Sequence, residues 1–206
     1  MKKLTKLVSI AGLVLSGLAA SHTANADVSY NVGYVSEYYY RGFFQKSSSA
    51  SAGLDFEQGG FYAGAWTADV GDGLEVDGYF GYGIETEGGL SLGVGFTGYY
   101  YTGEFDDTYE EINLSAGYGP VSVGYSIGEY AGFGSPSDYD FFEIGLDLGA
   151  GFYGTYGTFG QDAEGAYFEF GYGTTVAEID LGVSLILPDD TIGGGEGLVL
   201  SIGKGF

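Results

Sequence analysis

Large apolar residues recur at every second position in one segment of this chain after another, and the residues between them are small, polar or acidic. Between Ile179 and Leu187, for example, branched apolar residues alternate with Asp180, Gly182 and Ser184. The same alternation occurs in segments 90–97, 112–118, 121–127 and 142–148. A period of two residues places the two kinds of side chain on opposite faces of a β-strand. The alternation therefore predicts an all-β protein.

The alternating segments and the turn residues between them predict twelve strands. We expect these at 28–38, 47–56, 60–69, 73–85, 89–101, 108–118, 120–129, 138–148, 152–160, 165–173, 176–187 and 196–206. Tight connections such as Gln58-Gly59 and Thr174-Thr175 alternate with connections that are mostly longer, such as 39–46, 130–137 and 188–195. An even number of strands, with short turns at one end and longer loops at the other, is typical of bacterial outer-membrane barrels.

The second face of the strands distinguishes a membrane barrel from a soluble β-sandwich. A sandwich packs two apolar faces together and leaves the others in water, whereas a membrane barrel turns its apolar face to lipid and its polar face to the lumen. Here the second face carries glycine, serine and carboxylates, and glycine and serine inside strands suit a crowded lumen better than open solvent. We therefore expect an antiparallel transmembrane β-barrel, with a secreted soluble β protein as the alternative.

The first 26 residues differ from the rest of the chain and predict a secretory signal peptide. Lys2, Lys3 and Lys6 precede an apolar run at 7–20, and residues 24–26 have the small-x-small pattern of a cleavage site. The run is shorter than the roughly 20 apolar residues that a membrane helix needs. The expected organisation is a signal peptide at 1–26, cleaved after Ala26, and a barrel domain at 27–206 exported to the outer membrane of a Gram-negative cell.

Charge and residue usage after residue 26 exclude several function classes. Arg41, Lys46 and Lys204 are the only basic residues of this segment, against all 28 Asp and Glu of the chain, and the segment has no Cys or His. Without a basic surface, nucleic acid binding is excluded. Without Cys or His, neither a Cys/His metal site nor a histidine-dependent catalytic triad can be built. We therefore expect no enzyme activity, no metal site and no cofactor.

The strand phase points a set of carboxylates into the predicted lumen. The candidate pore-lining residues are Asp55, Glu75, Asp77, Glu111, Glu143, Asp147, Glu169, Glu178 and Asp180, joined by Arg41 if the first strand continues upward. Carboxylates concentrate cations and repel anions. The sequence therefore predicts a porin-like channel for passive diffusion of small solutes, with a preference for cations.

The width of the lumen is left open by the sequence. Glycine and serine in lumen phase favour open space, whereas four tyrosines in the same phase favour a constriction: Tyr79, Tyr99, Tyr101 and Tyr167. Twelve strands lie between the small barrels that side chains fill and the large ones that hold a channel. The alternative function is therefore a closed structural or surface-binding outer-membrane barrel without conductance.

The chain ends in an apolar alternation that includes Leu200 and Ile202 and closes on Phe206. This ending resembles the assembly signal of outer-membrane proteins, although Lys204 stands where an apolar residue or Tyr is usual. The expected partners are the barrel-assembly machinery, outer-membrane lipid and lipopolysaccharide, and small solutes or cations.

Three segments resemble a known family. Residues 36–45, SEYYYRGFFQ, resemble the S-D-Y-x-F-R-G-x-S-Q opening of the TorF-type porins of proteobacteria, although Phe44 replaces the usual hydroxyl residue. Residues 60–66 and 75–79 resemble the next two segments of that family. The resemblance implies an outer-membrane barrel with a pore, and it offers no catalytic residues to transfer.

Overall fold

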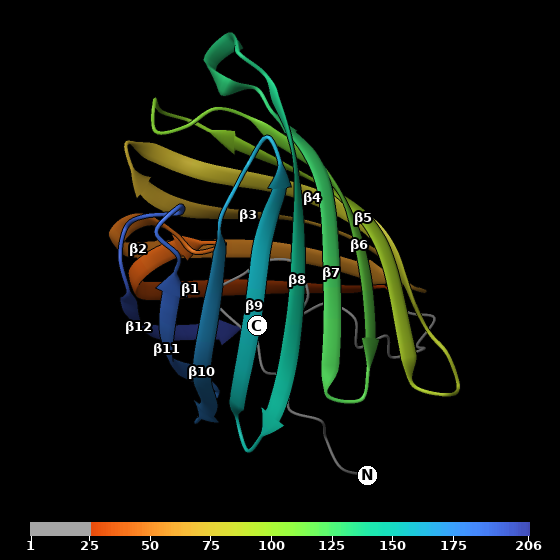
Figure 1. The fold of residues 1–206 in the computed structure, drawn as a ribbon. Helices are drawn as coiled ribbons and strands as arrows, with labels where there is room; N and C mark the ends of the chain where they lie inside the picture. The colour runs from red at the N-terminus through yellow and green to blue at the C-terminus, as the bar shows by residue number, and fades with distance from the viewer. Residues whose placement is uncertain (1–25) are drawn as a thin grey trace.

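Twelve antiparallel strands form one closed barrel in the computed structural model, which describes residues 26–206 (Figure 1). Each strand pairs with its neighbours in sequence, and β1 pairs with β12. The strands are β1 (Asp27–Tyr40), β2 (Phe43–Gln58), β3 (Phe61–Gly71), β4 (Gly73–Glu85), β5 (Leu90–Tyr101), β6 (Tyr109–Tyr118), β7 (Val121–Tyr130), β8 (Ser137–Gly149), β9 (Phe152–Gln161), β10 (Ala166–Val176), β11 (Ile179–Pro188) and β12 (Gly197–Gly205). The prediction of a twelve-stranded antiparallel barrel is confirmed. The expected signal peptide, apart from Ala26, lies outside the described residues.

One short 3-10 helix, η1 (Gly132–Gly134), lies between β7 and β8. Among residues 26–206, no helix has the length and apolar character needed to span a membrane.

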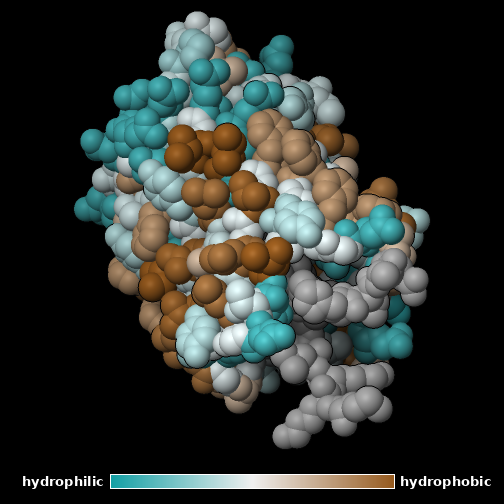
Figure 2. All heavy atoms as spheres, turned by 90° about the vertical axis from the view of Figure 1, so that its right-hand side faces the viewer, coloured by the Kyte–Doolittle hydropathy of each residue, from teal (hydrophilic) through white to brown (hydrophobic). Residues whose placement is uncertain are grey.

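The two faces of the barrel wall differ as the alternation predicts. In β6 the outward-facing Ile112 and Leu114 are 55% and 46% exposed, whereas the inward-facing Glu111 and Asn113 are 1% and 7% exposed. Figure 2 shows hydrophobic residues gathered over the middle of one side of the barrel, beneath a hydrophilic upper end. An apolar outer surface of this extent suits lipid and is unfavourable in water.

The chain enters and leaves the barrel at the end that carries the short turns. There Phe206 donates its N–H to the carbonyl of Tyr30 at 2.8 Å, and Tyr30 donates back to the carbonyl of Phe206 at 3.2 Å. Phe206, Ile202 and Leu200 are exposed on the outer surface. At the opposite end the β7–β8 connection with η1 projects beyond the strands, at the top of Figure 1.

Two connections differ from the sequence prediction. Segment 39–46, expected as a long loop, contains only a two-residue turn at Arg41-Gly42, with φ of 48° and 86°. Positive φ at both positions gives a turn whose twist matches the flanking strands, so β1 and β2 continue up to it. The β10–β11 turn lies at Ala177-Glu178, with φ of 51° and 65°, and not at Thr174-Thr175.

The different connections at the two ends predict different accessibility in whole cells. A cysteine introduced at Ser135 or Thr191, in the longer connections, should react with a membrane-impermeant thiol reagent added outside. A cysteine at Gly59, in the β2–β3 turn, should react only after the outer membrane is permeabilised. The natural chain has no cysteine, so labelling reports the introduced residue alone. Labelling of intact cells at Gly59→Cys only would reverse this orientation.

Candidate functional site

The lumen holds the distal half of a hairpin in addition to the side chains of the wall. β1 and β2 pair with each other up to Tyr40 and Phe43. However, β1 pairs with β12 only over residues 31–35, and β2 pairs with β3 only over residues 51–58. Residues 36–50, which we call the flap, therefore pair with no other strand in the described chain. At its base, Ser36 accepts a hydrogen bond from Leu200 on β12 and Ser49 donates one to Asp69 on β3; beyond these contacts the flap bends away from the wall and across the lumen.

Side chains of the flap contact strands on all sides of the barrel. The hydroxyl of Tyr38 donates to Glu75 Oε1 on β4 at 2.7 Å. A Cβ on Gly42 would lie 2.8 Å from Cβ of Tyr167 on β10. Ring centroids lie between 5.4 and 6.1 Å apart in the pairs Tyr38–Trp66, Tyr40–Tyr99 and Phe43–Phe159. These contacts reach β3, β4, β5, β9 and β10, so the flap closes the lumen near its longer-loop end.

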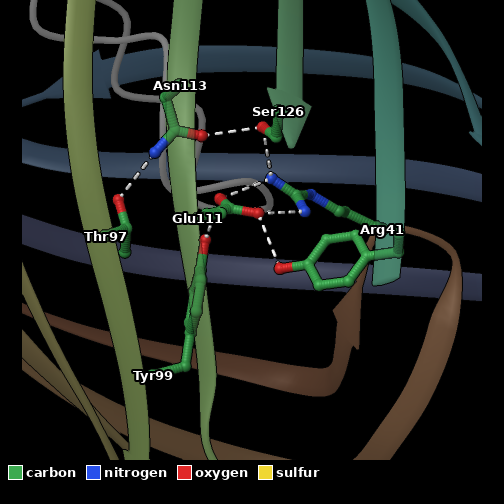
Figure 3. Close-up of polar contacts among 7 residues, drawn as sticks. Arg41, Thr97, Tyr99, Glu111, Asn113 and Ser126 are labelled. Carbon is green, nitrogen blue, oxygen red and sulfur yellow. Dashed lines mark hydrogen bonds and ion pairs between the residues drawn. The ribbon is translucent and has the colours of Figure 1, made fainter. Parts of the chain in front are cut away.

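Arg41, at the tip of the flap, forms a buried ion pair with Glu111 on β6 (Figure 3). Its Nη1 donates to Glu111 Oε2 at 2.8 Å, and its Nη2 donates to Oε1 at 2.9 Å and to Ser126 Oγ at 3.1 Å. The guanidinium also lies 4.3 Å from the centroid of the Phe141 ring. The side chains of Arg41 and Glu111 are 7% and 0% exposed. A bidentate, charge-assisted pair of this kind fixes both distance and orientation.

Glu111 has further partners that complete its hydrogen bonding. The hydroxyls of Tyr99 and Tyr139 donate to its two carboxylate oxygens at 2.8 and 2.9 Å. Four donor groups therefore converge on one carboxylate, and Ser126 continues the network to Asn113 (Figure 3). Burial of a charge is tolerated when it is paired and hydrogen-bonded in this way. The network holds the flap tip against β6.

The structure brings eight of the nine predicted carboxylates to the lumen side of the wall. Glu75, Asp77 and Glu111 lie towards the longer-loop end and are each 1% exposed; the other five are Asp55, Glu143, Asp147, Glu169 and Asp180. The prediction that Glu178 lines the lumen is wrong. This residue lies in the β10–β11 turn, its side chain is 84% exposed, and it accepts a hydrogen bond from Lys204. Arg41 is in the lumen because the flap folds inward, and not because β1 continues along the wall.

Most of these carboxylates are partnered by tyrosine hydroxyls. The pairs are Tyr38 and Tyr101 with Glu75, Tyr79 with Asp55, Tyr167 with Glu143, and Tyr153 with Glu169. Within residues 26–206, Arg41 is the only basic side chain that bonds any of the eight, and Oδ1 of the buried Asp77 has no hydrogen-bond partner. Strand phase could also have placed Tyr139 and Tyr153 in the lumen, but which carboxylate each one meets depends on the register between strands.

Several lumen glycines accommodate tyrosine rings, so the expectation that they leave open space is wrong at these positions. A Cβ on Gly171 would overlap the ring of Tyr153, and a Cβ on Gly64 would lie 2.5 Å from the hydroxyl of Tyr79. Tyr62 lies against two such glycines on neighbouring strands. The missing Cβ lets the ring lie flat on the backbone of the adjacent strand. The rings narrow the lumen from within.

The lumen is hollow towards the short-turn end. A cavity of about 130 Å³ lies there, and its lining includes Asp147, Tyr153, Asp180, Ser184 and Ser201. The described part of the chain contains no group of three or more carboxylates arranged to hold a metal ion. The site is therefore an acidic vestibule at one end, closed at the other end by the flap.

A closed, twelve-stranded antiparallel barrel with a polar lumen and an apolar exterior is the fold of a bacterial outer-membrane β-barrel, the class that includes the porins. The structure is similar to the KdgM porin solved in complex with disordered oligogalacturonate (TM-score 0.57, 8% identity, covering 88% of this chain and 99% of that one). It is also similar to a membrane protein from work on in-meso crystallisation (TM-score 0.54, 10% identity, covering 87% and 83%). At these identities the similarity shows the fold alone.

The chain belongs to the Gcw_chp family, described as bacterial proteins of unknown function, whose model matches residues 19–181. No curated protein sequence matches it significantly. OprD of Pseudomonas aeruginosa matches more loosely (TM-score 0.44, 11% identity, covering 91% of this chain and 68% of that one).

Proposed function

We propose that this protein spans the bacterial outer membrane as a TorF-type porin and lets small cations diffuse passively through its lumen. One observation carries the proposal: eight carboxylates lie on the lumen side, and Arg41 is the only basic side chain of residues 26–206 that bonds any of them. In a narrow lumen these charges act at an effective dielectric below that of water. The screening length is about 8 Å at physiological salt, so an ion inside a small barrel remains within their field.

Two neighbouring features support the same proposal. The cavity at the short-turn end gives solutes an acidic vestibule. The apolar exterior supports insertion into lipid, with the longer loops and their lipopolysaccharide contacts outside the cell. The barrel-assembly machinery would recognise the outward-facing Leu200, Ile202 and Phe206 at the end of β12.

The proposal predicts a cation preference in planar bilayers. Channel openings measured across a KCl gradient should reverse at a potential that favours K⁺ over Cl⁻, and higher salt should weaken this preference by screening. The triple variant Glu143→Gln, Asp147→Asn, Glu169→Gln should reduce the preference several-fold. The matched control neutralises Glu104, Glu110 and Glu129, which are exposed outside the lumen, and should leave the preference nearly unchanged.

Two results would contradict this assignment. Anion-preferring openings would show that the lumen carboxylates do not set selectivity. Folded barrels that never conduct, even after the flap has been released, would favour a closed structural or surface-binding barrel.

A further inference from the structure

We propose that the flap is a gate and that the Arg41–Glu111 pair is the latch that keeps it closed. This inference rests on the proposed channel function, but it concerns a movement that can be measured separately. It predicts that the lumen opens towards the longer-loop end when residues 36–50 swing back towards the wall.

The strand pairing allows this movement. The main chain of the flap bonds to no other strand of residues 26–206, since pairing with β12 ends at Val35 and pairing with β3 begins at Ser51. Swinging the flap outward would therefore break no strand ladder of the barrel. The proximal halves of β1 and β2 remain paired on both sides and would keep the barrel closed as a cylinder.

Specific side-chain contacts oppose the movement. Arg41 reaches β6 with two bonds to Glu111 and reaches β7 with one to Ser126. Tyr38 bonds Glu75 on β4. The flap forms two ion pairs with the wall: Lys46 with Asp69 on β3, whose side chains are 24% and 43% exposed, and Arg41 with Glu111, whose side chains are almost fully buried. Because charge-assisted bidentate bonds are stronger than neutral ones, this pair contributes most to holding the tip in place.

The chemistry of the latch also connects closure to permeation. Among residues 26–206, Arg41 is the only basic side chain bonded to the lumen carboxylates, and it lies on the part that moves, where it neutralises Glu111. Release of the flap would remove Arg41 from the path and leave Glu111 facing water together with Glu75 and Asp77, all of which are now 1% exposed. Opening of the flap would therefore also increase the negative charge that a permeating ion meets.

The test combines a labelling measurement with a conductance measurement in one background. Ser126→Cys places a thiol beside Arg41 at a site that is 5% exposed in the closed lumen. In this background, Arg41→Ala and Glu111→Gln break the latch from its two sides. Lys204→Ala removes the same charge from an exposed pair with Glu178, far from the flap, and is the control. Retained heat-modifiable migration on gels identifies the folded barrels.

We expect a cationic methanethiosulfonate reagent to label the thiol introduced by Ser126→Cys about tenfold faster or more in both latch variants, because loss of a charged hydrogen bond shifts an equilibrium by at least that factor. The Lys204→Ala control should label at the original rate. Bilayer conductance should rise in parallel, through longer or more frequent openings.

The outcomes separate the two proposals. Unchanged labelling in folded Arg41→Ala and Glu111→Gln barrels would overturn the latch, whatever the conductance. Faster labelling without any conductance would support the latch and overturn the channel function. Equal, measurable conductance in the original and latch-broken barrels would show that the flap does not gate the path.

Discussion

Replacing Glu111 with glutamine is expected to lower the free energy of unfolding by about 3–5 kcal/mol, the usual loss when one partner of a buried ion pair is removed. The guanidinium of Arg41 would lose its counter-charge, and the new NH2 group would face donors where one carboxylate oxygen now accepts from the guanidinium and from the hydroxyl of either Tyr99 or Tyr139. Release of the flap into water would recover part of this loss, so the lower end of the range applies if the gate opens readily.

Unfolding in urea, followed by the fluorescence of the only tryptophan, measures this effect. That residue, Trp66, lies on β3 with its ring 6.1 Å from that of Tyr38 in the flap. The control is Glu110→Gln at the adjacent position, where the side chain is exposed on the outer face, and we expect a change within about 0.5 kcal/mol. Equal losses in the two variants would contradict a special role for the buried pair.

A second pair of variants should change stability in opposite directions. Gly171→Ala would drive a Cβ into the ring of Tyr153, and overpacking of this kind costs about 1–3 kcal/mol. Gly78→Ala meets no atom within 4 Å, and alanine in a strand should stabilise by about 0.5–1 kcal/mol because the unfolded chain has less freedom to lose.

The same urea unfolding measures both substitutions. Adding Tyr153→Ala to Gly171→Ala should return most of the stability lost in the first step, because the ring that clashes is then gone. If Gly171→Ala and Gly78→Ala behave alike, the tyrosine rings do not depend on the glycines beneath them.

The barrel itself could be predicted from the sequence because the pattern that defines it lies within each strand. A strand with lipid on one face and a lumen on the other must alternate with a period of two, and the alternation between Ile179 and Leu187 displays this directly. Each strand then pairs with the next one along the chain, so strand number and order follow without any knowledge of distant contacts.

The flap could not be predicted in this way, because its position depends on residues far from it in sequence. Local pattern at 39–46 indicates a connection, but it does not show that Arg41 meets a carboxylate 70 positions further along. The filling of the lumen has the same limit. Gly171 and Tyr153 are each ordinary strand residues, and only the register between β9 and β10 brings one onto the other.

Because tyrosine rings lie on lumen glycines, the width of the bore in this barrel is not set by the number of strands alone. In most barrels a wider channel requires more strands, and hence a different circumference, shear and set of neighbours. Here part of the wall is an inner lining of tyrosine side chains such as Tyr62, Tyr79 and Tyr153. Exchanging one ring for a small residue would widen the passage by an aromatic thickness while every main-chain bond stays in place. Pore diameter in such a protein can therefore change by point mutation, during evolution or in engineered nanopores, without a change of fold.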